Sequence, residues 1–166
     1  MLKTFNIPFL YREYDDPDEL DPDDRELLLS ASEAALNAYA PYSGFRVGAA
    51  VRLTSRKIII GTNVENAAFP SGICAERNAL SNASSNHPGD IPVAMAIAAL
   101  TDDGLTAHPV SPCGNCRQVI AEEEYRSGKN IRIILSSRNK IRVIEKGGDL
   151  LPLQFNRNNI KFNPHL

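Results

Sequence analysis

Apolar residues recur at helical spacing early in the chain. Within residues 23–39 they stand three or four positions apart, as Leu28, Ala31, Ala35, Ala38 and Tyr39. This period predicts an amphipathic helix, which Pro41 and Gly44 should end.

An acidic stretch precedes that helix. Residues 15–24 hold seven acids in ten positions. Acids are favourable at helix N-termini, where the backbone dipole is positive. We therefore expect a solvated acidic turn here, and a metal site is the less favoured interpretation. Residues 1–14 mix aromatic and aliphatic side chains and predict an extended strand that packs on the body.

Shorter apolar runs predict five strands, at residues 45–53, 58–66, 93–100, 131–135 and 141–145. The first two are separated by a short polar turn, which indicates a hairpin. The third is apolar throughout, as expected for a central strand that is covered on both faces.

Two further helices are expected between the strands, over residues 74–85 and within 111–125. The chain shows no repeat and no linker, so residues 1–166 are expected to form a single domain. Helices inserted between strands predict an α/β fold, a three-layer α/β/α sandwich with a mixed central sheet of about five strands.

Composition narrows the class of protein. The 43% hydrophobic and 23% charged residues are typical of a soluble globular domain. A formal net charge of −2 argues against a nucleic-acid partner, which normally requires a basic patch. No apolar run approaches the ~20 residues that cross a bilayer, and the start lacks the features of a secretory signal. We therefore expect a cytoplasmic protein with neither a membrane nor a nucleic-acid partner.

The three cysteines are an odd number in a chain expected in a reducing compartment, so a complete disulfide framework is excluded. Cys113 and Cys116 form a C-x-x-C pair, which suits either a redox centre or half of a zinc site. All three thiols, with Cys74, stand where a helix is predicted to begin, and helix N-termini favour thiolates. None of the three histidines lies at ligand spacing, so zinc on three thiols would keep one position open, as in catalytic sites.

Glu76 stands two residues after Cys74. Taken alone, the pair is more ordinary as a buried cysteine followed by a surface glutamate. A carboxylate at this spacing cannot easily bind the same metal, but it can reach a water molecule beside it and move protons. The stretches CAE and PCGNC fit the three-cysteine form of the zinc-dependent nucleobase deaminases.

At greater length, the chain resembles the small, homotetrameric cytidine deaminases. The matching stretches are AYAPYSGFRVGAAV, GTNVENAAFPSGICAERNAL, SPCGNCRQVIAE and DLLPLQF, which span about residues 38–155. The resemblance implies the cytidine deaminase-like fold and one Zn²⁺ per subunit. It also implies hydrolysis of cytidine, and of 2′-deoxycytidine, to the uracil nucleoside and ammonia in pyrimidine salvage.

The resemblance also assigns the central residues of the site. Cys74, Cys113 and Cys116 correspond to the zinc ligands, and Glu76 corresponds to the proton shuttle. The backbone around Ala75 corresponds to the part that recognises the edge of the base.

Further residues correspond to positions around the substrate and the metal. Asn63 and Glu65 would bind the ribose hydroxyls, and Phe45 would lie against the pyrimidine. Phe155 would enter the site of a neighbouring subunit. The remaining two, Arg77 and Gln118, would hydrogen-bond around the zinc thiolates.

Several of these residues have ordinary interpretations when taken singly. Asn63 and Glu65 would mark the end of a strand, Phe45 would be a core residue, and Phe155 would cap the core. The chain also departs from the family in its N-terminal extension, residues 1–22, in its acidic run and in its Asn-rich tail.

Three other functions stay open at this point. The enzyme could deaminate a related aminopyrimidine nucleoside, such as a cytidine-like antibiotic. It could act on cytosine in RNA or DNA, although the acidic balance opposes this. A structural zinc module would need a fourth ligand that the sequence does not offer.

Overall fold

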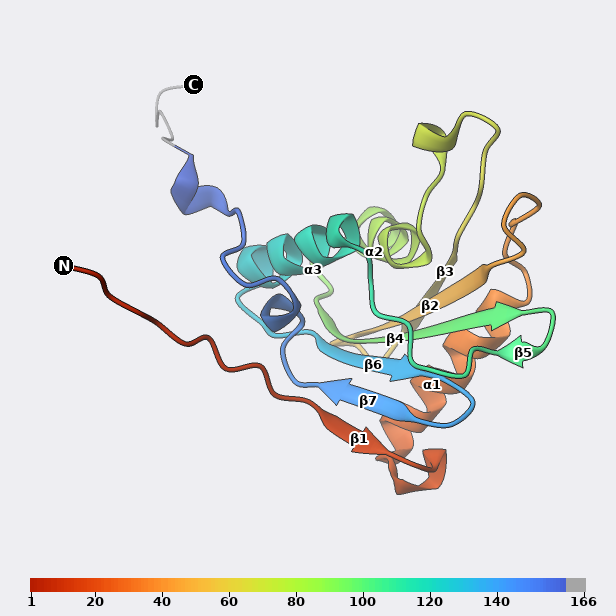
Figure 1. The fold of residues 1–166 in the computed structure, drawn as a ribbon. Coiled ribbons are helices and arrows are strands. Elements are labelled where there is room, and N and C mark those ends of the chain that lie inside the picture. Colours follow the sequence, from red (N-terminus) through yellow and green to blue (C-terminus); the bar gives the residue numbers. More distant parts are fainter. Residues whose placement is uncertain (161–166) are drawn as a thin grey trace.

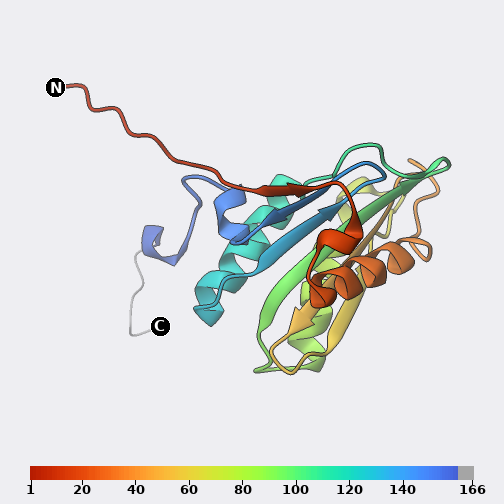
Figure 2. The same cartoon turned by 90° about the horizontal axis from the view of Figure 1, so that it is seen from below.

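The computed structural model describes residues 1–160, so His165 and the end of the Asn-rich tail lie outside the described residues. The chain forms three layers (Figures 1 and 2). Helix α1 (Pro22–Ala35) covers one face of a mixed sheet, while α2 (Ala75–Asn86) and α3 (Gly114–Ser127) cover the other. The expected α/β/α sandwich is confirmed.

The sheet contains the five expected strands and two short additional ones. The expected strands are β2 (Arg46–Leu53), β3 (Ile58–Thr62), β4 (Pro92–Thr101), β6 (Arg132–Ser136) and β7 (Ile141–Ile144). The additional strands are β1 (Arg12–Tyr14) and β5 (Gly104–Leu105). Residues 1–160 contain seven strands, against about five expected. Strand β1 lies within residues 1–14, where an extended strand was expected, whereas β5 has two residues and leaves no alternating pattern to detect.

Strand β4 lies at the centre of the sheet, whose order is β1-β7-β6-β4-β2-β3, with β5 paired to β4. It pairs antiparallel with β2 and parallel with β6. Its residues from Ala94 to Leu100 are all buried, which confirms a central strand that is covered on both faces.

The first helix is shorter than its apolar pattern predicts. It ends at Ala35, because Tyr39 leaves the helix and pairs with a segment after β3. The Tyr39 N–H donates to the Asn63 carbonyl at 3.2 Å, and the Glu65 N–H donates to the Tyr39 carbonyl at 2.8 Å. This pairing holds residues 39–45 beside residues 63–65, where the candidate site lies.

The N-terminal residues differ from the expected strand. Only β1 pairs with the sheet, through β7, and residues 1–11 project from the body with most side chains exposed (Figures 1 and 2). The acidic run behaves as a helix-starting turn. Asp16 caps the short 3-10 helix Pro17–Glu19, and Asp24 forms an ion pair with Arg132 at 2.8 Å.

Candidate active site

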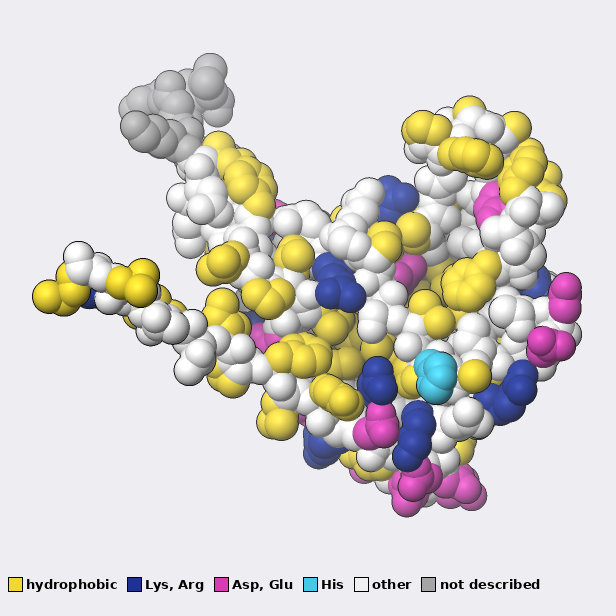
Figure 3. Space-filling view, viewed as in Figure 1, with side chains coloured by type: hydrophobic (Ala, Val, Ile, Leu, Met, Phe, Trp, Pro, Cys, Tyr) yellow, Lys and Arg dark blue, Asp and Glu magenta, His cyan; other side chains and the backbone are white. Residues whose placement is uncertain are grey.

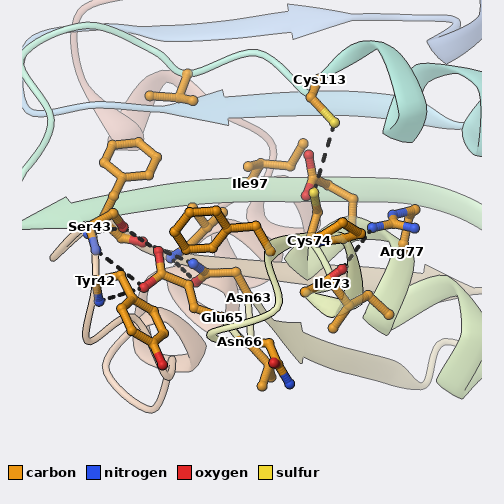
Figure 4. Close-up of a pocket in the computed structure, with 18 of the residues that line it drawn as sticks. Tyr42, Ser43, Asn63, Glu65, Asn66, Ile73, Cys74, Arg77, Ile97 and Cys113 are labelled. Atoms are coloured by element: carbon orange, nitrogen blue, oxygen red, sulfur yellow. Dashed lines mark hydrogen bonds between the residues drawn. The ribbon is translucent and has the colours of Figure 1, made fainter.

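The three cysteines meet at the N-terminal ends of two helices. Cys74 and Cys113 are the N-cap residues of α2 and α3, and Cys116 lies in the first turn of α3. Their sulfur atoms all lie within 4.8 Å of one another. The Sγ atoms of Cys74 and Cys113 are 3.8 Å apart (Figure 4), and those of Cys113 and Cys116 are 3.4 Å apart.

These spacings fit one tetrahedral zinc ion. Zn–S bonds of about 2.3 Å place two sulfur ligands about 3.8 Å apart at the tetrahedral angle. The cluster of Cys74, Cys113 and Cys116 therefore fits one zinc ion, in agreement with the sequence prediction. A site with three protein ligands keeps one coordination position for water or substrate, which is the catalytic arrangement.

The thiols lie in an environment where a divalent cation would stabilise their ionised form. Burial raises the pKa of the Cys74 and Cys116 thiols, and the negative charge of Glu76 raises both further. Burial also acts on Cys113, but hydrogen bonds from the backbone N–H groups of Cys116 and Asn115 help to lower its pKa below the ordinary value. Closely packed thiols beside a carboxylate are costly as anions, so a bound cation offsets the charge.

Glu76 is buried in the first turn of α2 and lines the same cavity as Cys74 and Cys113. Burial raises the pKa of its carboxyl, and hydrogen bonds from its own backbone and from Cys116 partly oppose this effect. The ordinary interpretation, which places Glu76 on the surface, is therefore wrong. Glu76 is a buried acid beside the thiol cluster.

The cavity has a volume of about 690 Å³, which lies in the range of small-molecule sites. Apolar and polar side chains both line it. The N-terminal ends of α2 and α3 place Glu76 and the thiols. Further lining comes from within residues 42–47, in β2 and the turn before it, and from residues 63–66, after β3. Of the predicted substrate residues, three line this cavity, namely Phe45, Asn63 and Glu65.

The Asn63 side chain hydrogen-bonds to the backbone of β2 and to the backbone of Phe45, the residue before β2. Its Oδ1 accepts from the Val47 N–H at 2.7 Å, and its Nδ2 donates to the Phe45 carbonyl at 2.9 Å. The amide keeps one further N–H and acceptor capacity. Asn63 therefore fixes the backbone that carries Phe45 and can still reach a substrate group in the cavity.

Glu65 accepts hydrogen bonds from the turn before β2. Its Oε2 accepts from the Tyr42 N–H at 2.8 Å and the Ser43 N–H at 3.2 Å, and its Oε1 accepts from the Ser43 hydroxyl (Figure 4). The hydrogen bond from the Ser43 side chain, and then the one from the Tyr42 backbone, lower the pKa of Glu65. The carboxylate is thus ionised and oriented at the cavity wall.

Ala75 and Arg77 lie beside the thiols. Ala75 is fully buried as the first residue of α2, where backbone N–H groups have no partner within the helix. The Arg77 guanidinium donates to the Gly72 carbonyl at 3.4 Å, and its buried Nε has no hydrogen-bond partner among residues 1–160. Its contact with the thiolates stays a prediction.

Gln118 and Phe155 contact each other away from this cavity. The Gln118 Nε2 donates to the Phe155 carbonyl at 2.8 Å. Within residues 1–160, Gln118 makes no hydrogen bond to a cysteine sulfur, so its predicted contact with a thiolate stays a prediction. Phe155 is 60% exposed and lines a separate small cavity, with Glu122 and Ile160. The structure therefore does not bring Phe155 into the site of its own chain.

The sequence assigned no role to several lining residues. Tyr42 and Ser43 lie in the stretch PYSG, which gives a turn signal but no sign that the turn faces Glu65. Phe69 lies at the tip of the 64–73 loop and contacts Tyr42 edge to face, with ring centroids 6.0 Å apart. Such neighbours depend on the pairing of residues 39 and 64, which no local pattern shows.

Arg117 ties the thiol loop to the C-terminal part of the chain. Its Nε donates to the Pro112 carbonyl at 2.8 Å, and its Nη1 donates to the Leu150 carbonyl at 2.9 Å. Arg117 therefore bridges the residue before Cys113 and the buried residue Leu150, which is distant in sequence.

Fold and site together define a class. Three thiols at helix N-termini, a buried carboxyl beside them and a cavity of small-molecule size are the parts of a zinc hydrolase. The comparisons with known proteins place the chain within that class.

The family model for the cytidine and deoxycytidylate deaminase zinc-binding region matches residues 21–127. The chain belongs to this family of zinc-dependent hydrolytic deaminases.

Individual relatives agree with this assignment. A cytidine deaminase of Halalkalibacterium halodurans is 46% identical over 100 residues, which cover 60% of this chain and 71% of the relative. The crystal structure of the Burkholderia pseudomallei cytidine deaminase superposes with a TM-score of 0.67 at 40% identity, covering 78% of this chain and 97% of that one. A blasticidin-S deaminase of Bacillus cereus is 29% identical over 95% of this chain and 100% of its own length.

Proposed function

We propose that this enzyme hydrolyses cytidine and 2′-deoxycytidine to uridine and 2′-deoxyuridine, with release of ammonia, in pyrimidine salvage. The observation that carries the proposal is one cavity that is lined by two thiols of the cluster, by Glu76, and by Asn63 and Glu65. The first two groups supply the chemistry of deamination, and the last two supply hydrogen-bonding groups for a sugar.

The polar residues suit a ribose. A carboxylate accepts from hydroxyl groups, and an amide can both donate and accept. Glu65 and Asn63 are alternate residues beyond β3, and both line the cavity. Phe45 lines it as well and offers an apolar ring for the pyrimidine, while the start of α2, near Ala75, has N–H groups that lack an acceptor within the helix and can donate to the edge of the base.

The proton transfers are assigned to Glu76. When bound at Cys74, Cys113 and Cys116, zinc supplies Lewis acidity that makes a water molecule easier to deprotonate. The Glu76 carboxylate accepts a proton from the attacking water and donates it to N3 of the ring. Glu76 then carries the second water proton to the amino group at C4, which leaves as ammonia.

The charges of the cavity favour a nucleoside over a nucleotide. Glu65 and Glu76 line it, and Arg77 is the single basic side chain in its wall among the described residues. A phosphate normally requires Arg or Lys donors or a free helix N-terminus. Arg77 is partly buried against the Gly72 carbonyl, and the N-terminus of α2 is assigned to the base, so a 5′-phosphate would lack a partner in this cavity.

A second candidate substrate is a cytidine-like nucleoside antibiotic. The Bacillus cereus blasticidin-S deaminase aligns with 95% of this chain, including residues outside the family model. The cavity volume of about 690 Å³ would leave room for a substituent on the nucleoside.

A substrate panel tests both candidates. The zinc-loaded chain would be assayed by ultraviolet absorbance with cytidine, 2′-deoxycytidine, 2′-deoxycytidylate and blasticidin S. We expect kcat/KM for the two nucleosides to exceed that for the nucleotide by about a hundredfold, since an uncompensated phosphate is strongly disfavoured. A higher kcat/KM for blasticidin S would favour the second candidate, and no turnover of either nucleoside would overturn the first.

We further propose a homotetramer with sites shared between subunits. Phe155 is exposed in its own chain, and further apolar side chains project with both terminal segments from the same end of the molecule (Figures 1 and 3). In the N-terminal segment the exposed residues include Phe5, Ile7 and Leu10. Exposed apolar side chains that gather at one end of a molecule are often covered by a partner. Residues 1–22 are thus proposed as an extension of a single domain that contributes to these contacts.

Mixed oligomers test the shared site. Phe155→Ala and Glu76→Gln are each expected to lower activity strongly. If Phe155 serves a neighbouring subunit, refolding the two variants together restores activity, because some sites receive an intact Glu76 from one chain and an intact Phe155 from the other. Activity that stays at the level of the separate variants would contradict sharing, and light scattering on the same samples gives the number of subunits.

The three thiols also support a cytoplasmic location. Three reduced cysteines are needed as metal ligands, and the reducing cytoplasm keeps thiols in this state. In residues 1–160, no helix has the length and apolar character needed to cross a membrane. A cell-fractionation measurement would test the cytoplasmic location that we propose.

A further inference from the structure

Glu65 owes its orientation to one short turn. Residues 42–44 form the turn before β2, and two backbone N–H groups and one hydroxyl from this turn point at the carboxylate (Figure 4). Gly44 has a φ of 65°, which lets the chain reverse between Ser43 and Phe45. The turn therefore surrounds one side of Glu65 with donors and leaves its other lone pairs for the cavity.

Ser43 is the one side chain among these donors. Its hydroxyl donates to Glu65 Oε1 and also accepts from the Phe45 N–H at 3.0 Å. A serine hydroxyl has one donor and two acceptor positions, so these two bonds fix the direction of its proton. The hydroxyl proton of Ser43 points toward Glu65, because the Phe45 N–H occupies an acceptor position of the same oxygen.

The same hydroxyl connects two substrate-facing residues. Phe45 is held at its N–H by Ser43 and at its carbonyl by Asn63, whose amide bonds also reach β2 at Val47. Loss of the Ser43 hydroxyl would leave the hydrogen bond from Asn63 to the Phe45 carbonyl in place. The carboxylate of Glu65 would lose its single side-chain donor among the described residues and would keep only backbone donors.

From this geometry we infer that Ser43 is a positioning residue for sugar recognition. It acts through Glu65, whose carboxylate it orients toward the substrate hydroxyls. The inference rests on the proposed nucleoside deaminase function and extends it to a residue that has no direct part in the chemistry. Because the reacting groups lie at the thiol cluster, Ser43 should affect KM for a sugar with hydroxyls and leave kcat nearly unchanged.

The test compares two substrates that differ only in the sugar. Ser43→Ala and the wild-type chain would be assayed with cytidine and with 2′,3′-dideoxycytidine, which lacks both ring hydroxyls. We expect KM for cytidine to rise about tenfold, the size expected for one hydrogen bond to a charged group. We expect kcat for cytidine and KM for the dideoxynucleoside to change less than about twofold, since the dideoxynucleoside offers Glu65 neither a 2′- nor a 3′-hydroxyl.

A matched control comes from another turn serine. The Ser55 hydroxyl accepts from the Lys57 N–H, two residues on, in the same way that Ser43 accepts from Phe45, but it lies in the turn between β2 and β3 and away from the cavity. Ser55→Ala should leave both KM values unchanged. Ser43→Thr keeps the hydroxyl and should restore KM for cytidine to within about threefold of the wild-type value.

A double-mutant cycle separates positioning from general destabilisation. In a Glu65→Gln background, Ser43→Ala should add little further loss for cytidine, because residues that act as a unit are not additive. If Ser43→Ala does not fold, Ser43→Cys takes its place, since a thiol is a weak donor of similar shape. Equal losses for both substrates, or additive losses in the cycle, would overturn the role of Ser43. A wild-type chain that turns over neither substrate would instead overturn the nucleoside function itself.

Discussion

Glu124 lies buried in α3 and accepts three backbone hydrogen bonds. Its Oε1 accepts from the N–H groups of Ile131 at 2.7 Å and Gly147 at 2.9 Å, and its Oε2 accepts from Gly148 at 2.9 Å. The carboxylate therefore joins α3 to the start of β6 and to the 3-10 helix Gly147–Leu150. A charged acceptor of buried N–H groups makes hydrogen bonds of the stronger kind.

Substitution of Glu124 should destabilise the domain. Glu124→Gln replaces one acceptor oxygen with an NH₂ group that faces a backbone N–H, and at least one buried donor loses its partner. We expect the free energy of unfolding to fall by about 2–4 kcal/mol, as measured by urea denaturation. Glu122→Gln, at an exposed position of the same helix, should change it by less than about 0.5 kcal/mol. Equal effects of the two variants would contradict the structural role of Glu124.

At the residue scale, the sequence predicted side-chain types better than their partners. Cys74, Cys113 and Cys116 were predictable as ligands, because thiols at helix starts have few other uses in a reducing compartment. Gln118 was not, since its bond to the Phe155 carbonyl depends on a C-terminal segment without regular pattern. The Ser43 contact with Glu65 joins residues 22 positions apart, which no spacing rule covers.

Helix α2 lies directly on β3 at Gly61. A Cβ atom at this position would lie 2.4 Å from the Ala79 nitrogen and 2.6 Å from the Ala75 carbonyl oxygen, so a side chain cannot fit without moving the helix. The first turn of α2 carries Glu76, and its N-cap is Cys74. This close approach therefore sets the height of the site above the sheet.

Gly61→Ala should lower both stability and activity. Overpacking against backbone atoms costs about 1–3 kcal/mol or more, so we expect a thermal midpoint lower by several degrees and a reduced kcat. Differential scanning calorimetry and the cytidine assay measure the two effects. For stability the control is Gly114→Ala, where a Cβ would meet nothing within 4 Å. An unchanged midpoint in Gly61→Ala would show that α2 is not packed as described.

At the element scale, periodicity located the helices and longer strands but not all of their ends. The apolar period continues to Tyr39, yet α1 stops at Ala35 because Tyr39 pairs with the segment after β3. The N-terminal pattern predicted a strand on the body, yet only Arg12–Tyr14 pair with β7. In this register the end of β7 at Ile144 lies opposite Tyr11, so residues 1–10 have no strand residue of β7 opposite them. In both cases the available long-range partners decide where the element ends.

At the scale of the molecule, the sheet topology explains why the thiols meet. Helices α2 and α3 lie on the same face, and each is followed in sequence by a strand, β4 and β6 respectively. These two strands are adjacent and parallel, so the two helices run in the same direction and their N-terminal ends lie together. Sequence order alone does not show that β4 and β6 are neighbours. The prediction of a shared zinc ion did imply that the N-terminal ends of α2 and α3 lie together.

The zinc ion should stabilise this arrangement. A ligand that binds only the folded state stabilises it by about 4 kcal/mol at a thousandfold excess over its dissociation constant. We expect chelator-treated protein to unfold at a lower temperature and to recover its midpoint on addition of Zn²⁺. Cys113→Ala, which lacks one ligand, should show a much smaller recovery. A midpoint that does not respond to chelator or zinc would contradict a metal that joins the two helices.

We assign to the Glu76 carboxyl the movement of protons beside a zinc ion bound by three cysteines. The most direct test of this assignment is the Glu76→Gln variant, with metal content and cytidine turnover measured on the same preparation. The substitution keeps the size of the side chain and removes its proton-accepting oxygen, while the three thiols are untouched. We predict about one zinc per chain, as in the wild type, and a kcat lower by roughly a hundredfold to ten-thousandfold. Cytidine turnover at the wild-type rate with zinc in place would contradict the assignment.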